Sequence, residues 1–384
     1  MSGTAHWFQY FPDHFMWSQG MIFAIEMAPW GAAALGEIDQ VGRRLRGREG
    51  DNDAWWAEWS AMAGRLERWA DAEAEQGHAL TAGSLYLRAA TYHFCGERFL
   101  PPDERKVASY RRCLRCFAEG TRRRYPAVER VEVPYEGASL PAYFMRAAGA
   151  GERAPAVVFF DGLDNAKELS VLFGGVELAR RGISTLAIDG PGQGESLRLR
   201  GIPSRFDYEV PARAAFDWVA TRPDVDPSRV GIMAFSMGGY YAPRAAAFEP
   251  RFKLCVAWGG HFDYHAAWVK RRQVMEAGGT KLSAPGFQLP WVLGVADMDA
   301  AMAKLKNYTL EGVAPRITCP FLVVHGEHDT IVPVEYAHRL FAAVGSRVKE
   351  IKVFTADEGG SEHCQEDNRQ IGANFIADWI ADHI

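Results

Sequence analysis

The chain contains the stretch Arg229-Val-Gly-Ile-Met-Ala-Phe-Ser236-Met-Gly-Gly-Tyr240, in which an apolar run changes to a glycine-containing turn at one serine. The run predicts a buried strand, and the residues after the serine predict a helix. A serine at such a sharp turn has strained backbone angles, so small residues are needed two positions before and two positions after it. Ala234 and Gly238 occupy these positions. The stretch therefore predicts a nucleophile, Ser236, with the Met237 backbone amide as an oxyanion donor.

Eight apolar runs have the composition of buried strands, and helical stretches lie between most of them. The runs are Val128–Tyr135, Leu140–Met145, Ala156–Phe160, Ile183–Ile188, Val230–Ala234, Leu254–Trp258, Phe321–His325 and Glu350–Phe354. The first two flank the turn Glu136-Gly137-Ala138 and predict an antiparallel hairpin. The later alternation of strand and helix predicts a parallel sheet with both faces covered.

Two further polar groups follow predicted strands in the order expected for a serine nucleophile, its acid and its histidine. Asp329 lies in the loop after the run Phe321–His325, where it can accept the histidine Nδ1–H or, alternatively, cap the helix that starts at Val334. His363 lies in a loop that we expect to be flexible, between the last strand and a C-terminal helix over Gln365–Ile380. We therefore predict a triad of Ser236, Asp329 and His363.

The loop after the strand Ala156–Phe160 is expected to provide the second oxyanion donor, from Gly162 or Leu163, although an ordinary strand-to-helix turn is an open alternative. Asp164 and Glu168 of the same loop are candidate substrate-binding residues. The glycines of Asp189-Gly-Pro-Gly-Gln-Gly194 lack the spacing of a phosphate-binding loop.

The segment after Trp258 contains His261, Asp263 and Tyr264, which we interpret as substrate-binding residues at the mouth of the pocket. A metal site is the alternative, but no third ligand lies at a readable spacing. The pair Cys113-Leu-Arg-Cys116 has no second ligand pair either. We therefore expect neither a metal nor a cofactor.

The N-terminal part of the chain has a different residue pattern, with apolar residues at helical spacing and no convincing strand. Its helical stripes are Trp55, Trp59, Met62, Leu66 and Trp69, then Leu80, Leu85, Leu87, Ala90 and Phe94, followed by a third helix over Lys106–Phe117. We expect these stripes to be packing surfaces. The predicted division is a helical cap domain, 1–124, and a catalytic domain, 125–384, with a lid insertion at about 261–315.

The composition is that of a globular protein. The 384 residues carry a net charge of −5, with 48% hydrophobic and 24% charged residues, which argues against dedicated nucleic-acid binding. The start of the sequence lacks the features of a secretory signal, and no run approaches the ~20 apolar residues of a membrane span. Six scattered cysteines form no disulfide framework, so we expect a cytoplasmic location and no membrane partner.

Four stretches together resemble one group of enzymes. They are Phe-Asp-Gly-Leu-Asp-Asn-Ala-Lys-Glu168, Ile-Asp-Gly-Pro-Gly-Gln-Gly-Glu195, Phe-Ser-Met-Gly-Gly-Tyr-Tyr241 and Glu-Pro-Arg-Phe-Lys-Leu-Cys-Val-Ala-Trp-Gly-Gly260. The group is that of α/β-hydrolases which holds 2,6-dihydroxypseudooxynicotine hydrolase and fungal hydrolases that shorten pigment polyketides, with esterase-like fermentation–respiration switch proteins as more distant relatives. The resemblance implies an α/β-hydrolase fold, with a mostly parallel central sheet flanked by helices and a helical N-terminal cap.

The resemblance also implies hydrolysis of a carbon–carbon bond in a β-diketone, an acyl-phenol or a polyketide-like substrate. The triad carries over onto Ser236, Asp329 and His363, with the Met237 and Leu163 amides as oxyanion donors. Ala234 departs from the glycine common at this position. Two alternatives stay open: hydrolysis of an ester, thioester or lactone, and a non-hydrolytic cyclase or dehydratase on the same fold. The expected partners are a small aromatic or polyketide-like substrate and, by the resemblance alone, a second copy of the chain.

Overall fold

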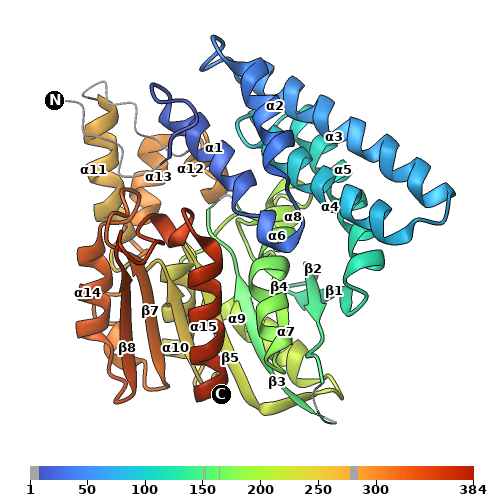
Figure 1. The fold of residues 1–384 in the computed structure, drawn as a ribbon. Helices are drawn as coiled ribbons and strands as arrows, with labels where there is room; N and C mark the ends of the chain where they lie inside the picture. The colour runs from blue at the N-terminus through green and yellow to red at the C-terminus, as the bar shows by residue number, and fades with distance from the viewer. Residues whose placement is uncertain (1–7, 150, 152, 164, 277–283) are drawn as a thin grey trace. The chain divides into compact units, whose positions relative to one another are not determined.

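The computed structural model describes residues 8–149, 151, 153–163, 165–276 and 284–384. The chain divides into two compact units, and Figure 1 labels the helices and strands along the chain. One unit comprises Met1–Val128 with Gln273–Gln288, and the other Glu129–Arg272 with Leu289–Ile384. The second unit therefore holds every strand, except that Val128, the first residue of the first strand, is assigned to the first unit. It also holds the three residues of the predicted triad.

The strands form one eight-stranded sheet in the order β1-β2-β4-β3-β5-β6-β7-β8. Their bounds are β1 Val128–Tyr135, β2 Ala138–Met145, β3 Ala154–Phe160, β4 Ser184–Ile188, β5 Val225–Phe235, β6 Cys255–Trp258, β7 Phe321–Gly326 and β8 Lys349–Phe354. Strand β2 pairs antiparallel with β4, and the pairs from β4 to β8 are parallel. The prediction of a mostly parallel sheet is confirmed.

The turn between β1 and β2 explains why these two strands are adjacent. Glu136 has φ 44° and Gly137 has φ 78°. Two consecutive residues with positive φ are what a tight two-residue hairpin needs, because that backbone twist matches the twist of the strands.

Helices surround the sheet. In the second unit they are α6 Lys167–Ser170, α7 Val176–Arg180, α8 Gly194–Arg198, α9 Glu209–Ala220, α10 Gly238–Phe248, α13 Met298–Leu305, α14 Val334–Ala343 and α15 Arg369–His383, with short turns of helix η2 Val171–Gly175, η3 Ala314–Arg316 and η4 His363–Gln365. Two more helices, α11 Tyr264–Glu276 and α12 Gln288–Leu293, cross the boundary between the units, because Gln273–Gln288 belongs to the first. Figure 1 shows α7 and α15 side by side on one face of the sheet.

Both faces of the sheet are buried, because alternate strand residues pack in opposite directions. Phe160 and Ile232 belong to a core shared with α9, α10 and α14. Phe159 faces the other way, where its ring meets that of Phe173 in η2 at a centroid distance of 5.7 Å. This arrangement places the carboxyl ends of the parallel strands, and the loops that follow them, at one edge of the sheet.

The first unit is helical among its described residues. Its helices are α1 Phe15–Ile25, η1 Ala28–Trp30, α2 Leu35–Leu45, α3 Asn52–Glu75, α4 Ala79–Glu97 and α5 Glu104–Arg124. The predicted stripes are largely buried, with two exceptions at the α3–α4 turn: Trp69 is 51% exposed and Leu80 is 63% exposed. Leu80 is the second residue of α4. Trp69 keeps the helical period and is followed by the fully buried Ala70, but its own ring is half exposed and donates to Glu73 at 3.0 Å. No helix in the described part of the chain is long and apolar enough to span a membrane.

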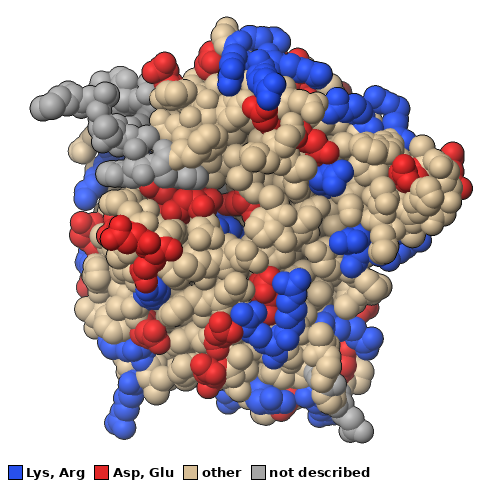
Figure 2. All heavy atoms as spheres, in the orientation of Figure 1, with Lys and Arg blue, Asp and Glu red and all other residues tan. Residues whose placement is uncertain are grey.

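The surface carries both signs of charge. Figure 2 shows Lys and Arg interspersed with Asp and Glu over one face, and a group of basic side chains near the end of α2. At the end of α2 and just after it, Arg43 pairs with Asp39, and Arg48 pairs with Asp51 at 3.0 Å.

A buried carboxylate, that of Glu67, contacts side chains of α4 and α5 inside the first unit. Glu67 is 3% exposed, and its carboxylate accepts from Arg115 at 2.8 Å and from the Cys116 thiol at 2.8 Å. Arg112 donates to its other oxygen. His93 Nε2 lies 3.3 Å from the carboxylate. One acid therefore satisfies polar groups from two neighbouring helices.

We predict that Glu67→Ala lowers the free energy of unfolding by about 2 kcal/mol, because the buried Cys116 thiol and the two arginines lose their shared acceptor. Urea unfolding measures the change. The matched control is Glu119→Ala, which removes a partly exposed carboxylate that pairs with Arg122 at 2.9 Å and with Arg123 and should cost less, at most about 1 kcal/mol. Equal effects of the two substitutions would contradict the prediction.

Candidate active site

Ser236 occupies a sharp turn between β5 and α10. Its φ is 59°, which is the left-handed region that non-glycine residues rarely adopt. Its N–H donates to Trp258 O at 2.8 Å, and its carbonyl accepts from Gly239 N at 2.7 Å. These bonds hold the strained residue, and the side chain stays partly exposed.

Small residues around the turn make room for it. A Cβ added at Gly238 would lie 2.6 Å from Ala234 Cβ, and one added at Gly162 would lie 2.8 Å from Ser236 Cβ. Both distances are shorter than side chains tolerate. Alanine is therefore compatible with position 234 because position 238 is glycine.

Three side chains from distant parts of the sequence meet at this turn. Ser236 Oγ lies 2.8 Å from His363 Nε2, and His363 Nδ1 lies 2.7 Å from Asp329 Oδ2. They come from the loops after β5, β7 and β8. The geometry is that of a hydroxyl, a base and an acid that orients the base.

The acid is held by its own loop. Asp329 Oδ1 accepts from Ile331 N at 2.8 Å and from Val332 N at 2.7 Å, which leaves Oδ2 for His363. Burial alone would raise the pKa of Asp329, but the charge and hydrogen bond of His363, together with His325, lower it to about 2. The carboxyl group is thus ionised at neutral pH.

The pairing with Asp329 also shifts the pKa of His363. Burial alone would lower the pKa of His363, but the charge of Asp329 and the neighbouring Cys364 thiol raise it well above its ordinary value. His363 is buried, as is Asp329. An ion pair with little access to water accounts for the direction of the shift.

The predicted oxyanion amides belong to two segments next to Ser236. Met237 directly follows Ser236 and precedes α10, while Gly162 and Leu163 belong to the loop after β3 that packs against Ser236. Among the described residues, no backbone carbonyl accepts a hydrogen bond from Met237 N or Leu163 N. Both amides are therefore available to an external acceptor.

The glycine-rich turn after β4 has a structural contact that sequence reasoning missed. Gln193 Nε2 donates to Asp161 O at 2.5 Å, and Gln193 Oε1 accepts from Gly190 N at 2.9 Å. The side chain thereby ties this turn to the loop that contains Gly162. Nothing in the one-dimensional pattern marks a glutamine as a link between two loops.

A buried lysine reinforces the same region. Lys167 Nζ lies 2.9 Å from Asp189, 3.0 Å from Glu195 and 2.7 Å from Glu168. The side chains of Lys167, Glu168 and Asp189 are at most 1% exposed. Glu168, a candidate substrate-binding residue, is thus engaged in an ion pair within the protein.

The other candidate substrate-binding residues differ in their contacts. Asp164 lies outside the described residues. Asp263 Oδ1 accepts from Ala266 N at 2.9 Å and so caps α11. Tyr264 and His261 are both buried, with their rings edge to face at 4.7 Å. Their contact with a substrate stays a prediction.

His261 follows β6 and is 1% exposed. Burial, with the nearby charges of Arg271 and His363, lowers its pKa well below the ordinary value. Its Nδ1 has no hydrogen-bond partner among the described residues. A neutral imidazole at this position can donate or accept a hydrogen bond.

Outside this site, Glu67, His93 and Cys116 bring three possible metal ligands together. The carboxylate already accepts from Arg112 and Arg115. Two guanidinium groups on one ligand disfavour a divalent cation there, so we interpret the cluster as the ion pair described above.

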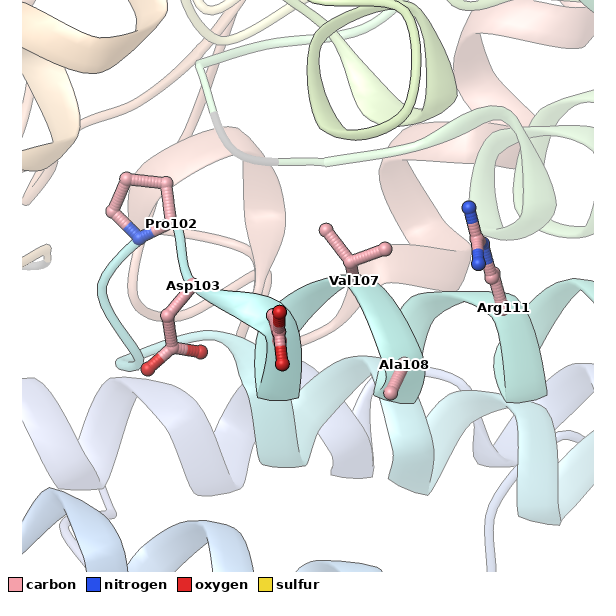
Figure 3. Close-up of a pocket in the computed structure, with 6 residues that line it drawn as sticks. Pro102, Asp103, Val107, Ala108 and Arg111 are labelled. Atoms are coloured by element: carbon pink, nitrogen blue, oxygen red, sulfur yellow. The ribbon is translucent and has the colours of Figure 1, made fainter.

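A shallow hollow in the first unit lies at the start of α5, lined by Pro102, Asp103, Glu104, Val107, Ala108 and Arg111. Figure 3 shows Val107 and Arg111 on one side of the helix and Asp103 pointing away from them. Asp103 caps α5 by accepting from Arg105 N at 2.9 Å and Lys106 N at 3.1 Å. None of these lining residues forms a nucleophile–base pair.

Comparison with known proteins agrees with the geometry. The model of the prolyl oligopeptidase family matches residues 177–384, which include Ser236, Asp329 and His363. The chain is an α/β-hydrolase of the prolyl oligopeptidase family. The hydrolase is 30% identical over 366 residues to 2,6-dihydropseudooxynicotine hydrolase of Paenarthrobacter nicotinovorans, with 93% of this chain and 92% of the relative covered.

A second relative is 20-hydroxy-prefusarin hydrolase of Gibberella moniliformis, at 28% identity, with 86% of this chain and 88% of the relative covered. Among solved structures, that of 2,6-dihydroxy-pseudo-oxynicotine hydrolase superposes with a TM-score of 0.78 at 24% identity, and covers 94% of this chain and 95% of the other. The fold of the hydrolase, over 94% of its length, is therefore shared with that solved structure. The resemblance predicted from the sequence motifs is confirmed.

We predict that His363 titrates above pH 6.5, the value of an ordinary histidine, because its protonated form is favoured by Asp329. A raised pKa means that the imidazolium persists to higher pH, so the neutral base appears only above that value. Nuclear magnetic resonance of the labelled imidazole follows the titration. In Asp329→Asn burial should dominate and move the midpoint below that of the wild type; an unchanged midpoint would contradict the account.

Proposed function

We propose that the chain is a serine-nucleophile hydrolase that cleaves a carbon–carbon bond in a β-diketone, an acyl-phenol or a polyketide-like substrate. The observation that carries the proposal is the continuous chain of hydrogen bonds from Ser236 Oγ through His363 to Asp329. Such a chain lets a neutral imidazole remove the hydroxyl proton while a carboxylate stabilises the imidazolium that results.

In the first half of the proposed reaction, Ser236 Oγ attacks a ketone carbonyl and its proton passes to His363 Nε2. The negative charge that develops on the carbonyl oxygen accepts hydrogen bonds from the Met237 and Leu163 amides. The carbon–carbon bond then breaks, and its electron pair leaves on a carbon that an adjacent carbonyl or phenol ring stabilises. That carbon takes the proton from His363.

In the second half, His363 accepts a proton from water as the water attacks the acyl group on Ser236. The ester bond to Ser236 Oγ breaks, and the proton returns to Oγ. The sum is one substrate and one water converted to a carboxylic acid and a second product with a new C–H bond. Since one imidazole serves both halves as base and acid, no further titratable group is required.

The choice of substrate class is supported by the relatives. Two of them are named as hydrolases of a pseudooxynicotine and of a prefusarin. The same three side chains also suit hydrolysis of an ester, thioester or lactone. We therefore treat ester hydrolysis as the competing function that the assay must separate. A cytoplasmic location and a homodimer stay predictions from the sequence and the resemblance.

We predict that Ser236→Ala lowers kcat on an aryl β-diketone by at least about 10⁴-fold, since removal of a triad nucleophile eliminates covalent catalysis. The measurement is steady-state hydrolysis of an aryl β-diketone and of the matching aryl ester by wild type and variant. The control is Ser228→Ala in β5, the strand before Ser236, which removes an exposed hydroxyl that donates to Asp226 at 2.6 Å.

The two substrates separate the possibilities. Faster turnover of the diketone, lost with Ser236, supports carbon–carbon hydrolysis. Turnover of the ester alone would contradict carbon–carbon hydrolysis and identify the protein as an ester hydrolase. Full activity of Ser236→Ala on the preferred substrate would show that Ser236 is not the nucleophile.

A further inference from the structure

We infer that Asp367 is a positioning residue for the reaction, because its carboxylate fixes the backbone that presents His363. The inference rests on the proposed function, in which His363 is the base. Asp367 belongs to the connection between β8 and α15, and its carboxylate bonds backbone amides of that connection.

The Asp367 carboxylate accepts hydrogen bonds from three consecutive backbone amides. Asp367 Oδ2 accepts from Gly360 N at 2.9 Å and Ser361 N at 2.9 Å, and Oδ1 accepts from Glu362 N at 3.2 Å. Hydrogen bonds to an ionised acceptor are stronger than those between neutral groups. The three amides belong to the three residues immediately before His363. Their position therefore determines where the His363 backbone, and with it the imidazole, lies.

The segment that Asp367 holds packs against the loop that contains Asp329. Ser361 O accepts from His328 N at 2.9 Å, and His328 is the residue before Asp329. A Cβ added at Gly326 would collide with the carbonyls of Ser361 and Glu362. Asp367 therefore fixes His363 and Asp329 relative to one another.

The chain after His363 is fixed as well. Arg369 donates to Cys364 O, and its guanidinium lies 4.6 Å from the ring centroid of Phe235. Gln365 Oε1 accepts from Trp258 Nε1 at 2.7 Å. Asp367 secures the side of the loop before His363, while these contacts secure the side after it.

The loop needs such support because its backbone is strained. Cys364 has φ 49° and Gln365 has φ 58°. Left-handed non-glycine residues persist only where the surrounding structure holds them in place. Loss of one set of contacts should let the loop relax and move the imidazole away from Ser236.

The test compares Asp367→Asn with Glu358→Gln in the full-length chain. Asp367→Asn keeps the side-chain shape but loses the charge and one of the two acceptor oxygens. Glu358 is the matched control: it lies in the same connection, and its carboxylate accepts a single backbone amide, Thr355 N at 3.0 Å. We expect kcat of Asp367→Asn to fall about 10- to 100-fold with KM within about threefold, as for a displaced catalytic group, and kcat of Glu358→Gln to stay unchanged.

A second readout is independent of turnover. The deshielded proton between His363 Nδ1 and Asp329 gives a proton resonance that is assigned by its loss in Asp329→Ala. We expect this resonance to shift or broaden in Asp367→Asn and to remain in Glu358→Gln. If Asp367→Asn does not fold, as judged by circular dichroism, Asp367→Glu takes its place, since it retains both acceptor oxygens on a displaced carboxylate.

A folded Asp367→Asn with unchanged kcat and an unchanged resonance would overturn the inference, as would a loss of thermal stability with kcat intact. The proposed function fails in a different way, through full activity of Ser236→Ala. The resonance still reports on the position of His363 in that case.

Discussion

The left-handed backbone of Ser236 is the constraint on which the rest of the site depends. A non-glycine residue in this region costs about 1–3 kcal/mol, so its neighbours must hold it. Ala234, Gly238 and Gly162 leave the space that the turn needs, and the hydrogen bond from Ser236 N to Trp258 O connects the turn to the next strand. The same turn leaves the hydroxyl within 2.8 Å of His363. Strain at one residue is thus balanced by packing that also assembles the site.

Much of the fold was predictable because its signals are local. Buried parallel strands are short apolar runs, and each predicted run corresponds to a strand within a few residues. The residues that the structure brings together at Ser236 were also predictable, because each follows such a run and because strand ends meet at one edge of the sheet. The hairpin was predictable from its turn, where glycine follows Glu136.

The remaining features depend on contacts that the linear pattern does not contain. The C-terminal helix begins at Arg369 and not at Gln365, because Cys364 and Gln365 are left-handed. The loop of His363 is held by hydrogen bonds, although its glycines suggested flexibility. The burial of Lys167 among three carboxylates is equally invisible in sequence, since a lysine is ordinarily exposed. Trp69 shows the opposite limit: helical period predicts a face but not how far the neighbouring helices cover it.

The central claim is that Ser236 is activated by His363, and covalent labelling tests it most directly. A fluorophosphonate probe transfers its phosphonyl group to an activated serine oxygen with loss of fluoride. The account predicts one adduct per chain, mapped by peptide mass spectrometry to the fragment that contains Ser236, absent from Ser236→Ala and much slower in His363→Ala. An active, unlabelled enzyme, or an adduct on another residue, would contradict it.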